Sequence, residues 1–205
     1  MELVIASNNS HKVRELRCAL GELAPFIQVL SLYDFPSYKP HLLHAEVVGD
    51  SFEENAKQKA QAAAAALNKI TLADDSGIIV PALAKVGAKF TRRYEHTDQS
   101  ATKQTRKLLE EMKSFKDLER QAYLECCLAI ATPQGILYKA TSRTEGILAE
   151  DERGKITFEF DTLFIKHDYS KTLGELAPSI RDRISHRRKA LEKLVGALSS
   201  LQAHQ

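Results

Sequence analysis

The stretch Leu72-Ala73-Asp74-Asp75-Ser76-Gly77 places two adjacent acids at the end of a short apolar run, residues 70–73, that predicts a buried strand. Adjacent carboxylates at the end of a strand repel each other and lose hydration, so a cation is needed to offset their charge. Mg²⁺ suits this position, because it is typically held by one or two carboxylates together with substrate phosphates. The alternative is a simple turn, in which Asp and Ser bond the local backbone and the glycine supplies positive φ.

The composition is that of an ordinary globular protein. The 205 residues are 43% apolar and 27% charged, which suits one domain or two lobes that share a core. The net charge of +2 provides no overall attraction for duplex nucleic acid. No apolar run approaches the ~20 residues of a membrane span. We therefore expect neither nucleic acid nor a membrane as a partner.

The three cysteines indicate a reducing compartment. Their number is odd, and Cys126 and Cys127 are neighbours in an expected strand, so their side chains should point to opposite faces. Together with Cys18 they predict buried free thiols rather than a disulfide frame or a zinc site. Residues 1–6 also lack the basic region of a secretion signal. The predicted location is the cytoplasm.

The apolar pattern predicts alternating strands and helices. A capping box at Ser51-Phe52-Glu53-Glu54 opens one helix, and Pro133-Gln134-Gly135 predicts the turn of a long hairpin. The expected strands are residues 3–6, 27–31, 70–73, 78–80, 121–132, 136–147 and 156–165. The expected helices begin near residues 13, 52, 81, 98, 172 and 187.

The segment Ser7-Asn8-Asn9-Ser10-His11-Lys12 joins the first expected strand to the first expected helix. Small polar residues cap the free amides of a helix, and that end of a helix attracts anions. Lys12 would add a movable cation for a phosphate group. A plain helix cap with a solvated lysine is the alternative interpretation.

Five separated stretches together resemble the inosine-triphosphate pyrophosphatases, which hydrolyse damaged purine nucleoside triphosphates. In chain order they are Ser7-Asn8-Asn9 with Lys12 and Glu15-Leu16, Ser51 to Ala56 with Lys59-Ala60, Ala73 to Gly77, Phe158 to Asp161, and Ile184 to Arg187 with Ala190-Leu191. The resemblance implies an α/β fold: a long twisted mixed sheet with flanking helices, and two lobes around a central cleft. It implies one domain over residues 1–205, a Mg²⁺ cofactor and a homodimer.

The resemblance also implies roles for single residues. Asp75 would bind the metal and activate water, Asp74 would assist, and Glu46 would supply another metal carboxylate. The other residues would contact the substrate. Ser7, Asn8, Asn9, Ser10, His11 and Lys12 would grip the triphosphate, Phe158, Glu159, Phe160, Asp161 and Arg181 would line the base pocket, and Ser76, Ser185, His186 and Arg187 would complete the contacts.

The implied reaction is hydrolysis of ITP, dITP or XTP between the α- and β-phosphates, which gives the monophosphate and pyrophosphate. The chain departs from the family pattern in the base pocket. Glu159 stands where the family has a glycine, Arg181 where it has a lysine, and Phe160 keeps a ring without its hydroxyl. We therefore expect altered or relaxed base selectivity. The alternative is a nucleotide-binding protein with lost or altered catalysis.

Overall fold

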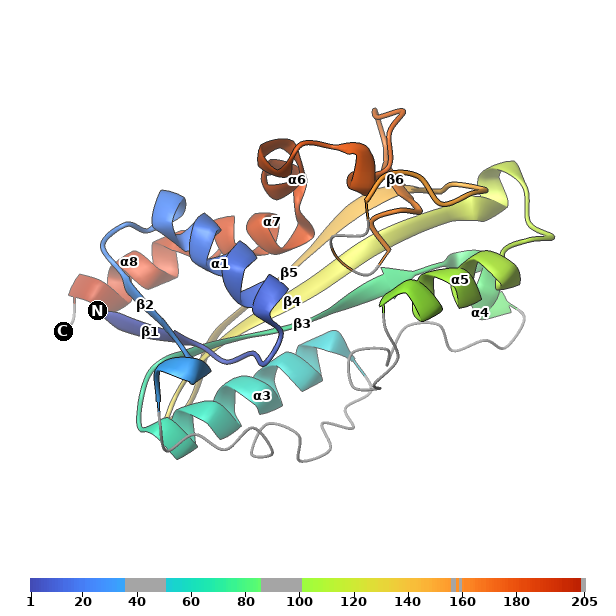
Figure 1. Ribbon diagram of the computed structural model, residues 1–205. Coiled ribbons are helices and arrows are strands. Elements are labelled where there is room, and N and C mark those ends of the chain that lie inside the picture. The colour runs from blue at the N-terminus through green and yellow to red at the C-terminus, as the bar shows by residue number, and fades with distance from the viewer. Residues whose placement is uncertain (36–50, 86–100, 156–157, 159, 204–205) are drawn as a thin grey trace. The chain divides into compact units, whose positions relative to one another are not determined.

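The computed structural model describes residues 1–35, 51–85, 101–155, 158 and 160–203 (Figure 1). The chain divides into two compact units. The first comprises Met1–Ser76, Cys126–Ser142 and Ser185–Gln205, and the second comprises Gly77–Glu125 and Arg143–Ile184. That these units are the two expected lobes stays a prediction. That they form a single domain around a cleft stays a prediction.

A six-stranded mixed sheet runs through the protein in the order β2-β1-β3-β4-β5-β6. β1 pairs in parallel with both β2 and β3, and β5 pairs antiparallel with β6. The expected α/β fold with a mixed sheet is therefore confirmed. In chain order the strands are β1 (Glu2–Ile5), β2 (Gln28–Ser31), β3 (Thr71–Ile79), β4 (Gln121–Thr132), β5 (Gly135–Leu148) and β6 (Phe164–Lys166).

Helices cover both faces of the sheet in the first unit. Figure 1 shows α1 (Ser10–Leu23), α7 (His186–Glu192) and α8 (Val195–Ala203) on one face and α3 (Phe52–Leu67) on the other. The core beneath α1, α7 and α8 is aliphatic and fully buried. It includes Leu3, Ile5, Leu16, Leu20, Leu72, Leu128, Ile130, Leu191 and Leu198.

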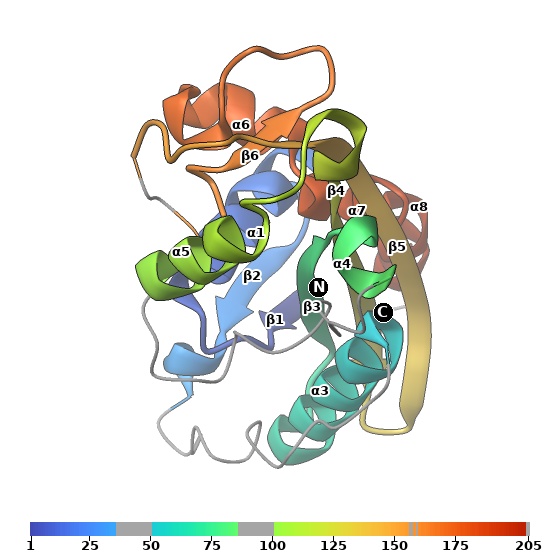
Figure 2. The same cartoon turned by 90° about the vertical axis from the view of Figure 1, so that its right-hand side faces the viewer.

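α3 packs closely because its inner face is built from small residues. Ala56, Ala60 and Ala63 are buried, and alanine adds little bulk between a helix and a sheet. The helix lies alongside the turn between β4 and β5 in both views (Figures 1 and 2), where Gln61 Nε2 donates to the carbonyl of Thr132 at 3.1 Å. Its start is capped by Ser51 Oγ, which accepts from the Glu54 amide.

The second unit has its own core beneath α5 (Ala101–Glu111). Its large buried members include Leu108, Met112, Leu148 and Phe164. The remaining elements are short. They are α4 (Pro81–Lys85), α6 (Pro178–Ile184) and the 3-10 turns η2 (Asp117–Arg120) and η3 (Leu173–Glu175), while η1 (Leu32–Asp34) belongs to the first unit.

Two expected elements are wrong. β3 runs without interruption from Thr71 to Ile79, so the Asp-Asp-Ser-Gly segment is neither a loop nor a turn. The described part of the expected strand 156–165 is mostly turn, because the amide of Asp161 bonds the carbonyl of Phe158 and the amide of Phe164 bonds the carbonyl of Phe160. Only Phe164–Lys166 forms a strand there.

Smaller expectations also needed correction. The helix expected after residue 187 is two helices, α7 and α8, and the segment near residue 172 is the 3-10 turn η3. Cys126 and Cys127 are buried free thiols, but Cys18 is exposed. It lies on the outer side of α1, whose buried residues are Lys12, Val13, Leu16, Ala19 and Leu20. No helix within the described ranges is both long and apolar enough to cross a membrane.

Candidate active site

The two acids of β3 form two separate buried clusters in the first unit. Neighbouring side chains on a strand point to opposite faces of the sheet, so Asp74 meets residues of α1 and α7 while Asp75 meets α3. Asp74 is 2% exposed and Asp75 is 5% exposed. Each acid is paired with cationic side chains of the protein, Asp74 with Lys12 and Arg187 and Asp75 with Lys59. This pairing explains how two adjacent charged residues can lie in the middle of β3.

Asp74 accepts from four side chains. Its Oδ2 atom lies 2.7 Å from Lys12 Nζ and 3.3 Å from Arg187 Nε, and Ser76 Oγ donates to it at 3.1 Å. Its Oδ1 atom accepts from Cys126 Sγ at 3.0 Å. Burial alone would raise the pKa of Asp74, but Lys12 and Arg187 hold that pKa well below its usual value.

Arg187 connects this acid to two further groups. Its Nη1 atom lies 3.0 Å from Glu15 Oε2 on α1, and its Nη2 atom donates to Ser76 Oγ at 2.6 Å. Ser185 donates to the other oxygen of Glu15 and also caps α7, accepting from the amides of Arg187 and Arg188. The start of α7 is thereby attached to α1.

Asp75 is held by two residues one turn apart on α3. Asn55 Nδ2 donates to its Oδ2 atom at 2.8 Å, and Lys59 Nζ lies 2.6 Å from its Oδ1 atom. Lys59 Nζ also lies 3.5 Å from the main-chain oxygen of Asp74. Positions i and i+4 share a helix face, so α3 presents an amide and a cation to the same carboxylate.

The loop before α1 is fixed by its own polar groups. Asn9 Oδ1 accepts from the amides of His11 and Lys12, and the Asn9 amide donates to Ser7 Oγ at 3.1 Å. Tyr33 Oη donates to the main-chain oxygen of Asn8 at 2.7 Å. The expected helix cap is confirmed, and Lys12 is 2% exposed and bound to Asp74 rather than solvated.

His186 and Cys126 are also buried near Asp74. His186 is buried, and burial, followed by the nearby charge of Arg187, lowers its pKa well below the usual value, so the ring is neutral near pH 7. Burial likewise raises the pKa of the Cys126 thiol well above its usual value, which keeps the thiol protonated as a donor to Asp74.

The site residues expected from the sequence fall into three groups. The first unit contains the acids of β3, the loop before α1 and the start of α7: Ser7, Asn8, Asn9, Ser10, His11, Lys12, Asp74, Asp75, Ser76, Ser185, His186 and Arg187. The second unit contains Phe158, Phe160, Asp161 and Arg181. Glu46 and Glu159 lie outside the described residues.

In the second unit, Asp161 and Arg181 form a long ion pair, with Arg181 Nη1 at 3.8 Å from Asp161 Oδ2. Phe160 is buried in the core of that unit, whereas Phe158 is half-buried. The two rings therefore differ in their access to a ligand.

Four residues of the buried clusters received no role from the sequence: Glu15, Asn55, Lys59 and Cys126. A signal existed for the two on α3, because Asn55 and Lys59 are polar residues on the same helix face as Ala56, Ala60 and Ala63. Glu15 stands three residues after Lys12 and so shares its side of α1. Nothing in the local sequence distinguishes Cys126 from Cys127.

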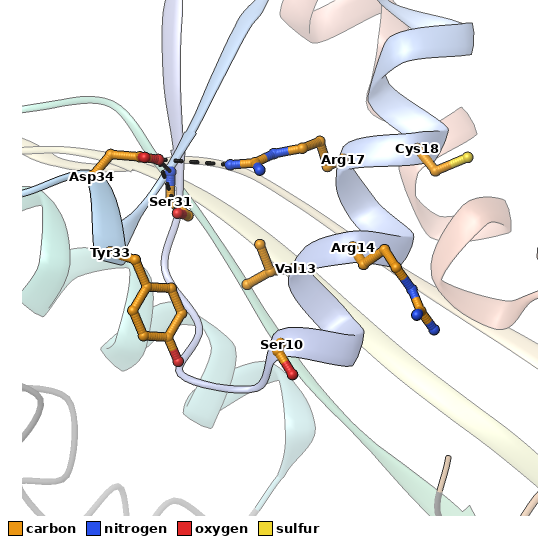
Figure 3. Close-up of a pocket in the computed structure, with 8 residues that line it drawn as sticks. All are labelled: Ser10, Val13, Arg14, Arg17, Cys18, Ser31, Tyr33 and Asp34. Atoms are coloured by element: carbon orange, nitrogen blue, oxygen red, sulfur yellow. Dashed lines mark hydrogen bonds and ion pairs between the residues drawn. The ribbon is translucent and has the colours of Figure 1, made fainter. Parts of the chain in front are cut away.

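A separate pocket of about 580 Å³ opens beside α1. Figure 3 shows Arg17 reaching toward Asp34 across it, whereas Arg14 and Cys18 point away. Asp34 also accepts from Ser31 Oγ at 2.9 Å and lies 3.6 Å from Arg17 Nη2. Ser31, Asp34 and Arg17 of this pocket thus bond one another, in contrast to the dense charge around the acids of β3.

The fold and the buried clusters define a class of protein: an α/β protein with cations from three helices set around acids at the centre of a mixed sheet. Lysine and arginine are also the side chains that commonly bind phosphate groups. The Ham1 family model matches residues 3–197, and this chain belongs to the Ham1 family.

Named relatives agree with this assignment. The chain is 39% identical over 203 residues to a dITP/XTP pyrophosphatase of Protochlamydia amoebophila, covering 98% of this chain and 100% of the relative. It is 40% identical over 195 residues to a dITP/XTP pyrophosphatase of Chlamydia trachomatis serovar L2, covering 95% and 91%. The structure of a HAM1 protein from Coxiella burnetii superposes with a TM-score of 0.80 at 32% identity, covering 98% and 99%. The resemblance found in the sequence is confirmed.

Proposed function

We propose that this protein hydrolyses non-standard purine nucleoside triphosphates such as dITP, XTP and ITP to the monophosphate and pyrophosphate. The relatives named dITP/XTP pyrophosphatase, which match nearly the whole chain, support this substrate class. The observation that carries the proposal is the pair of acids on β3, each held by cations from separate helices. Lys12 and Arg187 surround Asp74, and Lys59 binds Asp75.

The two acids take different roles in this proposal. The Asp74 side chain is fully buried and bound to two cations, so it orients Lys12 and Arg187 toward the phosphate groups. Asp75 is the base that accepts a proton from the attacking water, with Lys59 and Asn55 fixing its direction. The loop before α1 offers main-chain amides to the phosphates, Ser76 and Ser185 contact the substrate, and neutral His186 supplies a ring nitrogen.

The charge balance of the buried clusters favours a metal ion that enters with the substrate. Three cations, Lys12, Lys59 and Arg187, face three acids, Asp74, Asp75 and Glu15. Each of the two clusters is therefore neutral by itself, and a triphosphate adds several negative charges. A further positive charge is needed to bind and activate it.

The donors fit Mg²⁺ shared with the substrate. Across the described residues no three acidic, histidine or cysteine side chains gather as a metal site, and Mg²⁺ is commonly held by one or two carboxylates plus phosphates. Asp75 would hold it, with Glu46 as the second carboxylate. When bound, Mg²⁺ would neutralise phosphate charge and polarise the phosphoryl group.

Substitution of Asp75 tests the proposal. Asp75→Asn should lower pyrophosphate release from dITP by at least about 100-fold, because a general base typically contributes that much or more, while dITP binding persists. The control is Asp168→Asn, which changes an exposed acid in the second unit and should leave turnover unchanged. The wild-type assay is run with Mg²⁺ and with a chelator. Binding of dITP without pyrophosphate release by the wild type would favour the alternative of a nucleotide-binding protein.

The base would be held by residues of the second unit. Phe158, which is half-buried, is the ring that stacks on the purine, because Phe160 packs in the core. Asp161 and Arg181 would read the polar edge of the base, and the change from lysine to Arg181 relaxes selectivity. A panel of inosine, xanthosine, guanosine and adenosine triphosphates tests this. A strong preference for the inosine and xanthosine forms over guanosine would refute it.

A homodimer in the cytoplasm completes the proposal. The dimer is supported by the family resemblance, and gel filtration with light scattering would measure it. The three free thiols support a reducing compartment, and fractionation of cells that express a tagged chain would test it.

A further inference from the structure

We propose that Cys126 is a positioning residue of the candidate active site and acts through Asp74. The inference rests on the proposed pyrophosphatase activity. Cys126 lies on β4, is fully buried, and its thiol donates to Asp74 Oδ1 at 3.0 Å. The hydrogen bond of its thiol goes to the carboxylate that binds Lys12 and Arg187, so its effect on the site passes through that carboxylate.

The two oxygens of Asp74 have unlike partners. Oδ2 receives Lys12, Arg187 and Ser76, whereas Oδ1 receives the thiol. With one oxygen fixed by Cys126, the plane of the carboxylate is set and the other oxygen faces both cations. Without that donor, a buried lone pair is unsatisfied and the carboxylate can rotate toward either cation.

A protonated thiol suits this position because it carries no charge. A cationic donor at Oδ1 would compete for the charge of Asp74 and would weaken its hold on Lys12 and Arg187. An apolar side chain would leave Oδ1 without a partner. The thiol satisfies the oxygen and leaves the full negative charge to the two residues that would bind phosphate.

Cys127 provides a matched control within the chain. It is the next residue of β4 and is equally buried. Its side chain lies on the other face of the strand, and its thiol is 3.7 Å from the carbonyl of Leu128. Removing either sulfur deletes the same volume from the same strand, but only one removal leaves Asp74 Oδ1 without its donor.

The experiment compares Cys126→Ala, Cys126→Val, Cys126→Ser and Cys127→Ala with the wild type. Steady-state kinetics with dITP and Mg²⁺ are measured, together with binding of inorganic pyrophosphate by calorimetry. Removal of a partner that orients a site residue typically costs about 10–100-fold, so alanine and valine at 126 should raise KM and the pyrophosphate Kd about tenfold. Because the cations contact phosphate throughout the reaction, kcat should change by less than about threefold. Serine, which still donates to Oδ1, should restore both constants to within about threefold of the wild type.

Failure of the proposed pyrophosphatase activity and failure of the proposed role of Cys126 give different results. A wild type that releases no pyrophosphate from dITP contradicts the proposed activity, whereas the calorimetric comparison still tests the positioning role. Equal constants for Cys126→Val and the wild type, equal losses in Cys126→Ala and Cys127→Ala, or no recovery in Cys126→Ser would overturn the role of Cys126. Valine fills the space of the thiol, so Cys126→Val can still be compared with the wild type if Cys126→Ala does not fold.

Discussion

Arg187 serves three acceptors with one guanidinium group. Its Nε, Nη1 and Nη2 atoms reach Asp74, Glu15 and Ser76. A lysine has a single ammonium on a flexible stem and cannot reproduce this fixed fork. The next residue, Arg188, has the same chemistry in a more open setting, where it pairs with Glu22 and Glu192.

The change from arginine to lysine at these two adjacent positions should therefore have unequal effects. Arg187→Lys should lower the free energy of unfolding by about 2–4 kcal/mol, because buried acceptors lose charged hydrogen bonds. Arg188→Lys should lower it by less than ~1 kcal/mol, as expected for a surface ion pair. Urea denaturation at pH 7 measures both. Similar losses of unfolding free energy in Arg187→Lys and Arg188→Lys would show that the guanidinium fork of Arg187 is not what stabilises the cluster around Asp74.

The acids of β3 show what residue-level reasoning could and could not predict. The need for cations beside Asp74 and Asp75 followed from their charge alone. The identity of those cations did not, because Lys12, Lys59 and Arg187 are distant in sequence and meet only in the fold. The turn interpretation failed for the same reason: it relied on local backbone bonds, whereas distant side chains stabilise the acids within a strand.

Strands and turns could be predicted from the sequence where apolar runs and turn residues follow each other clearly. The apolar run at residues 121–132 predicted β4 with its observed bounds, and the Pro-Gln-Gly signal placed the following turn. The apolar pattern at residues 156–165 wrongly predicted a strand, because Phe160 and Phe164 face one core from successive turns of backbone rather than from one face of a strand. Alternation indicates a strand only when neighbouring strands are available to pair with it.

The end of α5 depends on a buried arginine that no acid neutralises in the described structure. Arg120 donates from Nε to the carbonyl of Leu148 at 2.8 Å, from Nη1 to Met112 at 2.8 Å and from Nη2 to Ala149 at 2.5 Å. The guanidinium therefore joins the chain just after α5 to the end of β5. Carbonyl groups past the end of a helix also carry partial negative charge, which favours a cation there.

Arg120→Met should destabilise the protein by about 2–4 kcal/mol, because several buried carbonyl groups lose a charged donor at once. Arg106→Met is the control, since Arg106 lies on α5 with a side chain 73% exposed and only a 3.6 Å contact to Glu152. Its cost should be below ~1 kcal/mol. Thermal unfolding followed by circular dichroism compares the two variants. A small effect at Arg120 would mean that water satisfies those carbonyl groups.

At the scale of the whole molecule, the family match spans both units. The buried acids and cations belong to the first unit, whereas the proposed base contacts, Phe158, Asp161 and Arg181, belong to the second. If phosphate binding and base selection are divided in this way, they should respond to different substitutions.

Arg181→Lys introduces the residue type that the family resemblance implies at this position. It should raise the preference for dITP over dGTP by roughly 5–10-fold, since small changes in a binding pocket discriminate by such factors. The inhibition constant of pyrophosphate should stay the same, because Lys12 and Arg187 are unchanged. Ratios of kcat/KM for the two substrates measure the effect. A parallel change in pyrophosphate inhibition would contradict the division.

Stability of the whole molecule should depend on pH through His186. In the folded chain burial and the charge of Arg187 lower the pKa of this ring well below 6.5, although Asp74 partly opposes the shift. In the unfolded chain the ring titrates near its ordinary pKa of about 6.5. Above that pH neither state binds the proton, so the free energy of unfolding does not depend on it. Below that pH only the unfolded state binds the proton, and stability falls as pH decreases toward the folded pKa.

The ligand-free wild type should therefore lose stability as pH falls from 6.5 to 5, with a contribution from His186 that approaches ~1.4 kcal/mol per pH unit. His186→Gln removes this proton-binding group and should flatten the dependence in that range, even if the variant is less stable at pH 7. His167→Gln changes an exposed histidine of the second unit and should keep the wild-type slope. Urea denaturation at half-unit steps of pH gives the three curves. Parallel curves for the wild type and His186→Gln would show that the ring takes up its proton in the folded protein. That result would contradict a buried, neutral His186, and the proposed role of His186 in substrate binding depends on this neutral state.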